Sequence, residues 1–220
     1  MCLVQSLNAA LAKDNTERPV SAWLKKHPLV ISRVVGGHPG KVVAEFPFGS
    51  DYYADFVTLR TYSGGCDINF IELEPPGADL FTKKGRMAKH LNDAVRQVDD
   101  WRVFVDKNKD LVLRDLSKFF RRKELIFAFR DHEPIDECGR QIYDHRCWAR
   151  WYYHILIGRR HFLNDDHALK KAAFHQHHSI NVMTYDQMLK TAAELDDYER
   201  SRPKFGSETP RNKRRGLCVP

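Results

Sequence analysis

The sequence is poor in cysteine, and its cysteines do not follow any recognised paired spacing. They number five, and no two of them form a CxxC motif. An odd number of scattered cysteines argues against a disulfide framework and indicates a reducing compartment. The positions are Cys2, Cys66, Cys138, Cys147 and Cys218.

Long apolar runs are also missing, as is a basic leader. No apolar run approaches the ~20 residues that a helix needs to cross a bilayer. The first basic residue is Lys13, so the opening segment does not have the pattern of a secretory signal. The stretch His38–Lys41 (HPGK) lacks the GxxxxGK[ST] pattern of a phosphate-binding loop. These absences predict a cytoplasmic protein with no membrane association.

What the sequence does have is a surplus of basic charge. Its 36 lysines and arginines outnumber its 29 acidic residues, which gives a formal net charge of +7. Such a surplus favours an acidic polymer as partner, above all nucleic acid, although simple solubility explains it as well.

The order of apolar patterns predicts an α/β fold. Three β-rich segments (residues 41–49, 51–59 and 66–74) are joined by short Gly/Ser turns, which is typical of an antiparallel meander. A helix-period pattern over residues 83–108 follows, then a strand at 151–159, a helix at 165–178, a strand at 179–184 and a helix at 185–200. We expect a central mixed sheet flanked by helices.

The same patterns divide the chain into three parts. Residues 1–35 predict a helical segment, with helices at 3–13 and 20–27 and a stop at Pro28. Residues 36–200 predict one folded domain. Residues 201–220 are basic and rich in proline, and we expect them to be a flexible tail that adds non-specific affinity for DNA.

Three acids gather at the ends of two neighbouring predicted strands. Asp55 stands between apolar residues, and Glu72 and Glu74 close the next strand. Residues two apart on a strand share a face, so Glu72 and Glu74 should point the same way. If the two strands pair as a hairpin, Asp55 can lie across from Glu72. Carboxylates this close repel one another, and a divalent cation such as Mg²⁺ removes the conflict.

Several blocks of the sequence resemble the nuclease domain of the Shedu anti-phage defence proteins. They are ADFV, FIELEPPGADLFTKKG, LNDAVRQVDDWRVFV, ILIGRR and INVMTYDQML, and together they span roughly residues 40–190. The resemblance implies a PD-(D/E)xK restriction-endonuclease-like core and a metal-dependent DNA endonuclease of bacterial immunity.

The resemblance also implies roles for individual residues. Asp55 and Glu72 correspond to the two metal-binding acids of the motif, with Mg²⁺ (or Mn²⁺) as cofactor. The motif lysine is replaced by Glu74, which would bind metal or hold a water, so the catalytic lysine would come from Lys84 or else Lys83. Gln97 matches a glutamine often found on the long helix, and Glu45 is a further acid that could contribute.

We expect DNA contacts from four basic residues, and we expect the protein to assemble as a homo-oligomer. The four are Lys83, Arg86, Arg159 and Arg160. Two alternatives stay open: a catalytically silent nucleic-acid-binding module, and a nuclease subunit that needs an activating partner from the defence system or the phage. A lysine amine near the three acids would favour the enzyme, whereas an arginine paired with Glu74 and no lysine nearby would favour the binding module.

Overall fold

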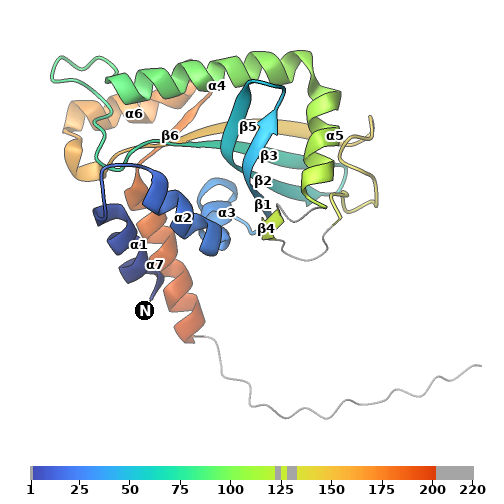
Figure 1. The fold of residues 1–220 in the computed structure, drawn as a ribbon, viewed down its shortest axis with the longest axis horizontal. Coiled ribbons are helices and arrows are strands. Elements are labelled where there is room, and N and C mark those ends of the chain that lie inside the picture. Colours follow the sequence, from blue (N-terminus) through green and yellow to red (C-terminus); the bar gives the residue numbers. More distant parts are fainter. Residues whose placement is uncertain (1, 122–124, 128–132, 202–220) are drawn as a thin grey trace, which may run out of the picture.

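The computed structural model describes residues 2–121, 125–127 and 133–201. These residues form an α/β fold with a six-stranded mixed sheet between two layers of helices, which confirms the predicted fold class (Figure 1). The helices are α1 (Leu3–Ala12), α2 (Arg18–Lys26), α3 (Pro28–Gly36), α4 (Lys89–Lys107), α5 (Lys109–Phe119), α6 (Asp165–His178) and α7 (Tyr185–Ser201). The strands are β1 (Lys41–Phe48), β2 (Tyr52–Tyr62), β3 (Gly65–Leu73), β4 (Leu125–Phe127), β5 (Trp148–Leu156) and β6 (Asn181–Met183).

The strand order across the sheet is β4-β1-β2-β3-β5-β6. β1, β2 and β3 form the expected antiparallel meander, while β5 runs parallel to β3 and β6 runs parallel to β5. A parallel neighbour needs a long crossover connection, and α4 and α5 lie within the one between β3 and β5. Strand β3 is therefore central, with its carboxyl end beside that of β5.

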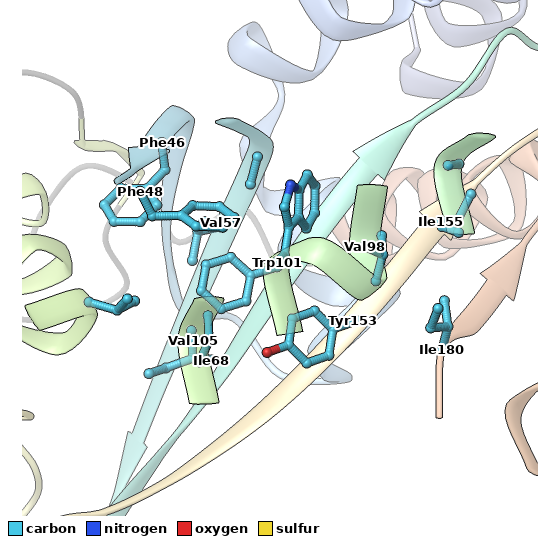
Figure 2. Close-up of a cluster of buried hydrophobic side chains, with 14 of the residues drawn as sticks. Phe46, Phe48, Val57, Ile68, Val98, Trp101, Val105, Tyr153, Ile155 and Ile180 are labelled. Atoms are coloured by element: carbon cyan, nitrogen blue, oxygen red, sulfur yellow. The ribbon is translucent and has the colours of Figure 1, made fainter. Parts of the chain in front are cut away.

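One face of the sheet, which we call the α4 face, is covered by α4, α5 and α6 (Figure 1). Figure 2 shows Trp101 of α4 among Phe46 and Phe48 of β1 and Tyr153 of β5. Trp101 is fully buried, and its ring lies 5.4 Å from the ring of Phe48 in an edge-on arrangement. This packing fixes the position of α4 along β3.

The opposite face, which we call the α7 face, is covered by α1, α2, α3 and α7 (Figure 1). Its core contains Val20 and Leu24 of α2 together with Phe56 of β2 and Ile71 of β3. Helices from residues 1–35 thus bury sheet residues directly. The division of the chain at residue 36 stays a prediction, since shared packing does not show which segments fold alone.

Two helix boundaries differ from those expected. Helix α2 ends at Lys26, just before Pro28 as expected, but Pro28 also begins α3, because a proline at the first helical position loses no hydrogen bond. Helix α4 begins at Lys89 rather than near residue 83, because residues 82–87 make a tight turn in which Gly85 has a φ of 70°. A left-handed residue cannot continue an α-helix. Asn164 caps the start of α6, since its side chain accepts from the His167 N–H.

The strand predicted at 151–159 lies a few residues earlier, at Trp148–Leu156, and residues 109–119, for which no element was expected, form α5. The expected basic tail, apart from Ser201, lies outside the described residues. In the described part of the chain, none of the helices combines the length and apolarity that a membrane span requires.

Candidate functional site

Asp55 and Glu72 meet where β2 and β3 part. The ladder between these strands ends at the pair Phe56–Ile71, and the next pair in the same register would be Asp55 and Glu72. Instead of a ladder bond, the Leu73 N–H donates to Oδ2 of Asp55 at 2.7 Å. The expectation that Asp55 lies across from Glu72 therefore agrees with the register. The Asp55 carboxylate thus takes the place of a backbone carbonyl as the acceptor, and the two strands separate at this residue.

A kink on the other side of β2 helps to aim Asp55. The pairs Ala44–Phe56 and Phe46–Ala54 flank Glu45 and Asp55, which are not themselves paired. Glu45 has a φ of 54°, unusual for a residue with a side chain. Val43 and Phe46 both pack on the α4 face, although residues three apart on a regular strand face opposite sides. The alternation of side chains therefore slips by one residue between them. The register between β1 and β2 is the same on both sides of this point, so the irregularity is confined to Glu45 and Asp55.

Glu72 is buried beneath α4. Its position in β3 puts it on the same face as Phe70, and only 9% of its surface is exposed. The Gln97 side chain of α4 makes a hydrogen bond to it. Burial raises the pKa of Glu72 to about 9, the charges of Asp55 and Glu74 add to the rise, and the Gln97 hydrogen bond opposes it. At neutral pH this carboxyl holds a proton unless a cation offsets the charge.

Asp55 shows the same effect in weaker form. Burial raises its pKa to about 6, while the Leu73 N–H lowers it. The charges of Glu17 and Glu45 raise it further, and the charge of Lys25 lowers it. Both acids therefore lie in an environment that penalises negative charge, which is typical of functional sites but also occurs in structural clusters.

Glu74 lies just beyond the end of β3. Its N–H donates to the Leu156 carbonyl at 2.8 Å, and its carbonyl accepts from the Tyr185 hydroxyl at 2.7 Å. Its carboxylate meets Nδ1 of His90 at 2.9 Å. Burial raises the pKa of Glu74, and the His90 contact opposes that rise. Glu74 and Glu72 both face α4, as their shared strand face predicts.

The basic residues expected near the acids lie in two other places. Lys83, Lys84 and Arg86 are exposed in the turn before α4, and within the described residues none of their side chains makes a hydrogen bond or ion pair with the acids. This turn contacts α6, since Lys170 Nζ donates to the Gly85 carbonyl at 3.0 Å. Their catalytic and DNA-binding roles stay predictions.

Arg159 and Arg160 follow β5 and meet the first turn of α7. The guanidinium of Arg159 donates to Oδ1 of Asp186 at 3.2 Å, and the backbone N–H of Arg160 donates to Oδ2 at 2.6 Å. The Arg160 side chain is exposed, whereas Arg159 is half-buried. Arg160 is thus the better placed of the two to contact a phosphate.

The donor chemistry of the acid pair fits Mg²⁺. This ion takes oxygen ligands, and it commonly binds one or two carboxylates and completes its shell with water. Asp55 and Glu72 supply two such carboxylate groups from adjacent strands. Among the described residues no set of three or more His, Cys, Asp and Glu side chains is grouped as a metal site. The Glu74 carboxylate is already bonded to His90, so it is less suited to be a third metal ligand than the sequence suggests.

Three residues around the acids were not expected from the sequence. His90 lies seven residues before Gln97, and that spacing puts both on one face of α4. The helix period could therefore have revealed His90. Glu17 and Lys25, at the two ends of α2, act on Asp55 through their charges. Nothing in their local sequence signals this, because α2 is brought to the site by tertiary packing alone.

The fold and the acid cluster place the protein in a class: an α/β protein with a nuclease-like core, a mixed sheet flanked by helices, and acids where two central strands diverge. The chain matches the family model "Shedu protein SduA, C-terminal" over residues 14–189. It therefore belongs to that family, as its sequence blocks suggest, and family membership implies a role in anti-phage defence. No curated protein matches the sequence. The matched range begins before α2, so α2 and α3 belong to the family's region.

Proposed function

We propose that this protein is a Mg²⁺-dependent endonuclease that cleaves phosphodiester bonds of DNA in anti-phage defence, with Asp55 and Glu72 as the metal-binding acids. The observation that carries the proposal is the pair of buried acids at the opening between β2 and β3, in a chain of the Shedu family. The substrate, the cofactor and the activity are parts of the proposal.

Physical chemistry supports a cation at this pair. Two buried carboxyls without a cation must keep protons or pay the cost of unpaired charge. Their pKa values of about 6 and about 9 show that cost. A divalent cation can displace the protons and leave both groups ionised. When bound, Mg²⁺ would lower the pKa of a coordinated water and stabilise charge on the phosphate.

The surrounding residues have supporting roles in this proposal. Gln97 orients Glu72 through their hydrogen bond, and Glu74, bonded to His90, holds a water or a distant part of the metal's shell. Lys83, Lys84, Arg86 and Arg160 are exposed and contact the DNA backbone, and the half-buried Arg159 supports Arg160 through Asp186. We propose in addition that the protein acts as a homo-oligomer, with a defence-system or phage component as a potential activator.

Calorimetric titration with Mg²⁺ and Mn²⁺ tests the metal assignment. The variant Asp55→Asn keeps an oxygen acceptor for the Leu73 N–H but loses the charge, so we expect an intact fold and loss of metal binding. Asp51→Asn removes the same charge from an exposed turn at the start of β2 and should bind metal as the wild type does. Equal binding by all three proteins would contradict the assignment.

A plasmid-cleavage assay with Mg²⁺, Mn²⁺ or EDTA tests the activity. We expect nicking or linearisation by the wild type and by Asp51→Asn, and none by Asp55→Asn or in EDTA. The motif lysine is replaced by Glu74, and this favours a second candidate, a nucleic-acid-binding module without activity. DNA binding without cleavage under every metal and partner condition would replace the enzyme with that module.

A further inference from the structure

The acid cluster needs a positive side chain that its motif does not supply. Glu74 stands where the lysine is expected, and it is bonded to His90. Hydrolysis of a phosphodiester places extra negative charge on the phosphate oxygens in the transition state, and a fixed cation stabilises that charge. A site made of acids and metal alone would lack this contribution.

One lysine of the described chain, Lys25, lies close to Asp55 although it comes from another element. Lys25 lies in the last turn of α2, and its Nζ lies 2.5 Å from Oε1 of Glu45. Glu45 stands opposite Asp55, between the pairs Ala44–Phe56 and Phe46–Ala54. Lys25 thus contacts the residue that stands beside Asp55 on the adjacent strand β1, and its charge acts on Asp55.

The backbone that carries Lys25 is held firmly. Val20, Trp23 and Leu24 of α2 are buried in the core of the α7 face, and Trp23 Nε1 donates to the Ser6 hydroxyl at 2.9 Å. Their spacing of three and four leaves Lys25 at the edge of the buried stripe, with about a third of its side chain exposed. A long side chain on a rigid helix can reach the site at a low cost in entropy.

The ion pair with Glu45 does not trap Lys25. The Glu45 side chain is 72% exposed, and exposed ion pairs contribute about 0–1 kcal/mol. A phosphate group entering the strand opening carries a full negative charge and competes well with such a partner. Glu45 thus holds Lys25 near the opening in the free protein and releases it when a phosphate arrives.

The alternative lysines are less well placed. The turn that contains Lys83 and Lys84 is tied to α6 through Lys170. Lys25 is among the main charges that act on Asp55, whereas neither Lys83 nor Lys84 is.

We propose that Lys25 supplies the cation that the motif lacks, by donating hydrogen bonds from its ammonium to the scissile phosphate or the attacking water. The proposal rests on the nuclease function proposed above. In the reaction, the water oxygen bonds to phosphorus and its proton passes to solvent, while the bond from phosphorus to the leaving oxygen breaks and that oxygen takes a proton. Lys25 stays an ammonium throughout.

The test compares four variants of the full chain in the plasmid-cleavage assay. Lys25→Ala should lower the cleavage rate at least about 100-fold, the usual loss when one transition-state donor is removed. Lys25→Arg, which keeps the charge, should recover part of the rate. Lys26→Ala removes the same charge from the next, exposed position of α2 and should cut as the wild type does. Glu45→Gln removes the group that holds Lys25 in the free protein and should lower the rate much less than Lys25→Ala does.

Two further measurements separate a role in the reaction from a role in folding or binding. Lys25→Ala should bind Mg²⁺ in calorimetry at least as tightly as the wild type, because a nearby positive charge is gone. It should unfold within about 2 °C of the wild type, since an exposed ion pair contributes little. Equal, small losses of rate in Lys25→Ala and Glu45→Gln would show a structural ion pair and overturn the proposal.

The outcomes also separate this inference from the function on which it rests. If the wild type cuts and Lys25→Ala cuts at the same rate, Lys25 has no such role and the nuclease function stands. If Lys84→Ala abolishes cleavage and Lys25→Ala does not, the cation comes from the turn before α4. If the wild type never cuts with any metal, the proposed function fails, and this inference fails with it.

Discussion

At the scale of single residues, the site is defined by the cost of burying negative charge. Glu72 lies on the core face of β3 and Asp55 fills a gap in the ladder, so neither carboxylate is well solvated. The hydrogen bonds they receive, from Gln97 and from the Leu73 N–H, lower their pKa values but do not offset the burial. The folded protein therefore binds protons at this pair that the unfolded chain releases.

The pH dependence of stability tests this description of Glu72. Its pKa is about 9 in the folded state against an ordinary value of 4.5, so its contribution to stability is lost as the pH rises from about 4.5 to about 9. Glu72→Gln cannot ionise. We expect it to unfold like the wild type at pH 4 and to be more stable by more than about 1 kcal/mol at pH 7.5, since one pKa unit corresponds to about 1.4 kcal/mol.

Urea unfolding followed by circular dichroism at both pH values measures this difference. Glu137→Gln, at an exposed position, is the matched control and should show no such gain. Mg²⁺ should narrow the gap at pH 7.5, because it stabilises only the protein that binds it. A Glu72→Gln variant less stable than the wild type at pH 7.5 would show that this carboxylate is compensated in the fold.

At the scale of elements, the loop after β3 is held against the loop after β5. The Gly158 N–H donates to the Pro75 carbonyl at 3.2 Å, and the Gly158 carbonyl accepts from the Tyr185 N–H at 3.1 Å. Tyr185 in turn donates to the carbonyl of Glu74. Gly158 has a φ of 60°, and a Cβ there would lie 2.4 Å from the Ala78 carbonyl oxygen. This contact keeps the backbone beside the acids in place.

We expect Gly158→Ala to destabilise the protein by about 1–3 kcal/mol, through left-handed strain and the clash with the Ala78 carbonyl. Thermal unfolding gives the measurement. Gly36→Ala is the control, because it ends α3 with no atom within 4 Å of the added carbon and without a positive φ. Alanine there should be neutral or slightly stabilising. Equal effects of the two substitutions would mean that the close approach at Gly158 is not needed.

At the scale of the whole molecule, two cores share one sheet. The α4 face is completed by helices that follow β3, whereas the α7 face takes α1, α2 and α3 from the beginning of the chain and α7 from its end. Helix α1 is joined to α7 by Asp196, whose carboxylate accepts from the N–H groups of Leu3 and Val4 at 2.9 and 3.0 Å. The site lies at the edge of both cores and depends on each.

A chain that begins at residue 36 tests whether the first helices are a separate segment. It would expose Val42, Phe56 and Ile71, all fully buried in the whole protein. We expect this chain to lose cooperative thermal unfolding and to bind a hydrophobic dye, because uncovered apolar surface of this size costs more than the marginal stability of a domain. A chain that ends at Ser201 should unfold as the full chain does. Cooperative unfolding of the shortened chain would establish a domain boundary at residue 36.

The sequence by itself determined most of the strands and most of the helices, because these depend on local periodicity, whereas β4 and α5 were not expected. The alternation of β3 put Glu72 and Glu74 on one face, and the heptad-like spacing on α4 aligned its apolar stripe. Helix α3 was missed because a proline can begin a helix as well as end one. The start of α4 was misplaced because the apolar period continues through Gly85, whose positive φ interrupts the helix.

Only the tertiary structure decided the environment of the acids. Burial and neighbouring charges set their pKa values, and those depend on which elements lie around the strand opening. Lys25 is 30 residues before Asp55 in the sequence, and its charge acts on Asp55 because the apolar stripe of α2 packs on the α7 face. A pattern read along the chain favours lysines close to Glu74, whereas long-range packing brings Lys25 of α2 close to Asp55.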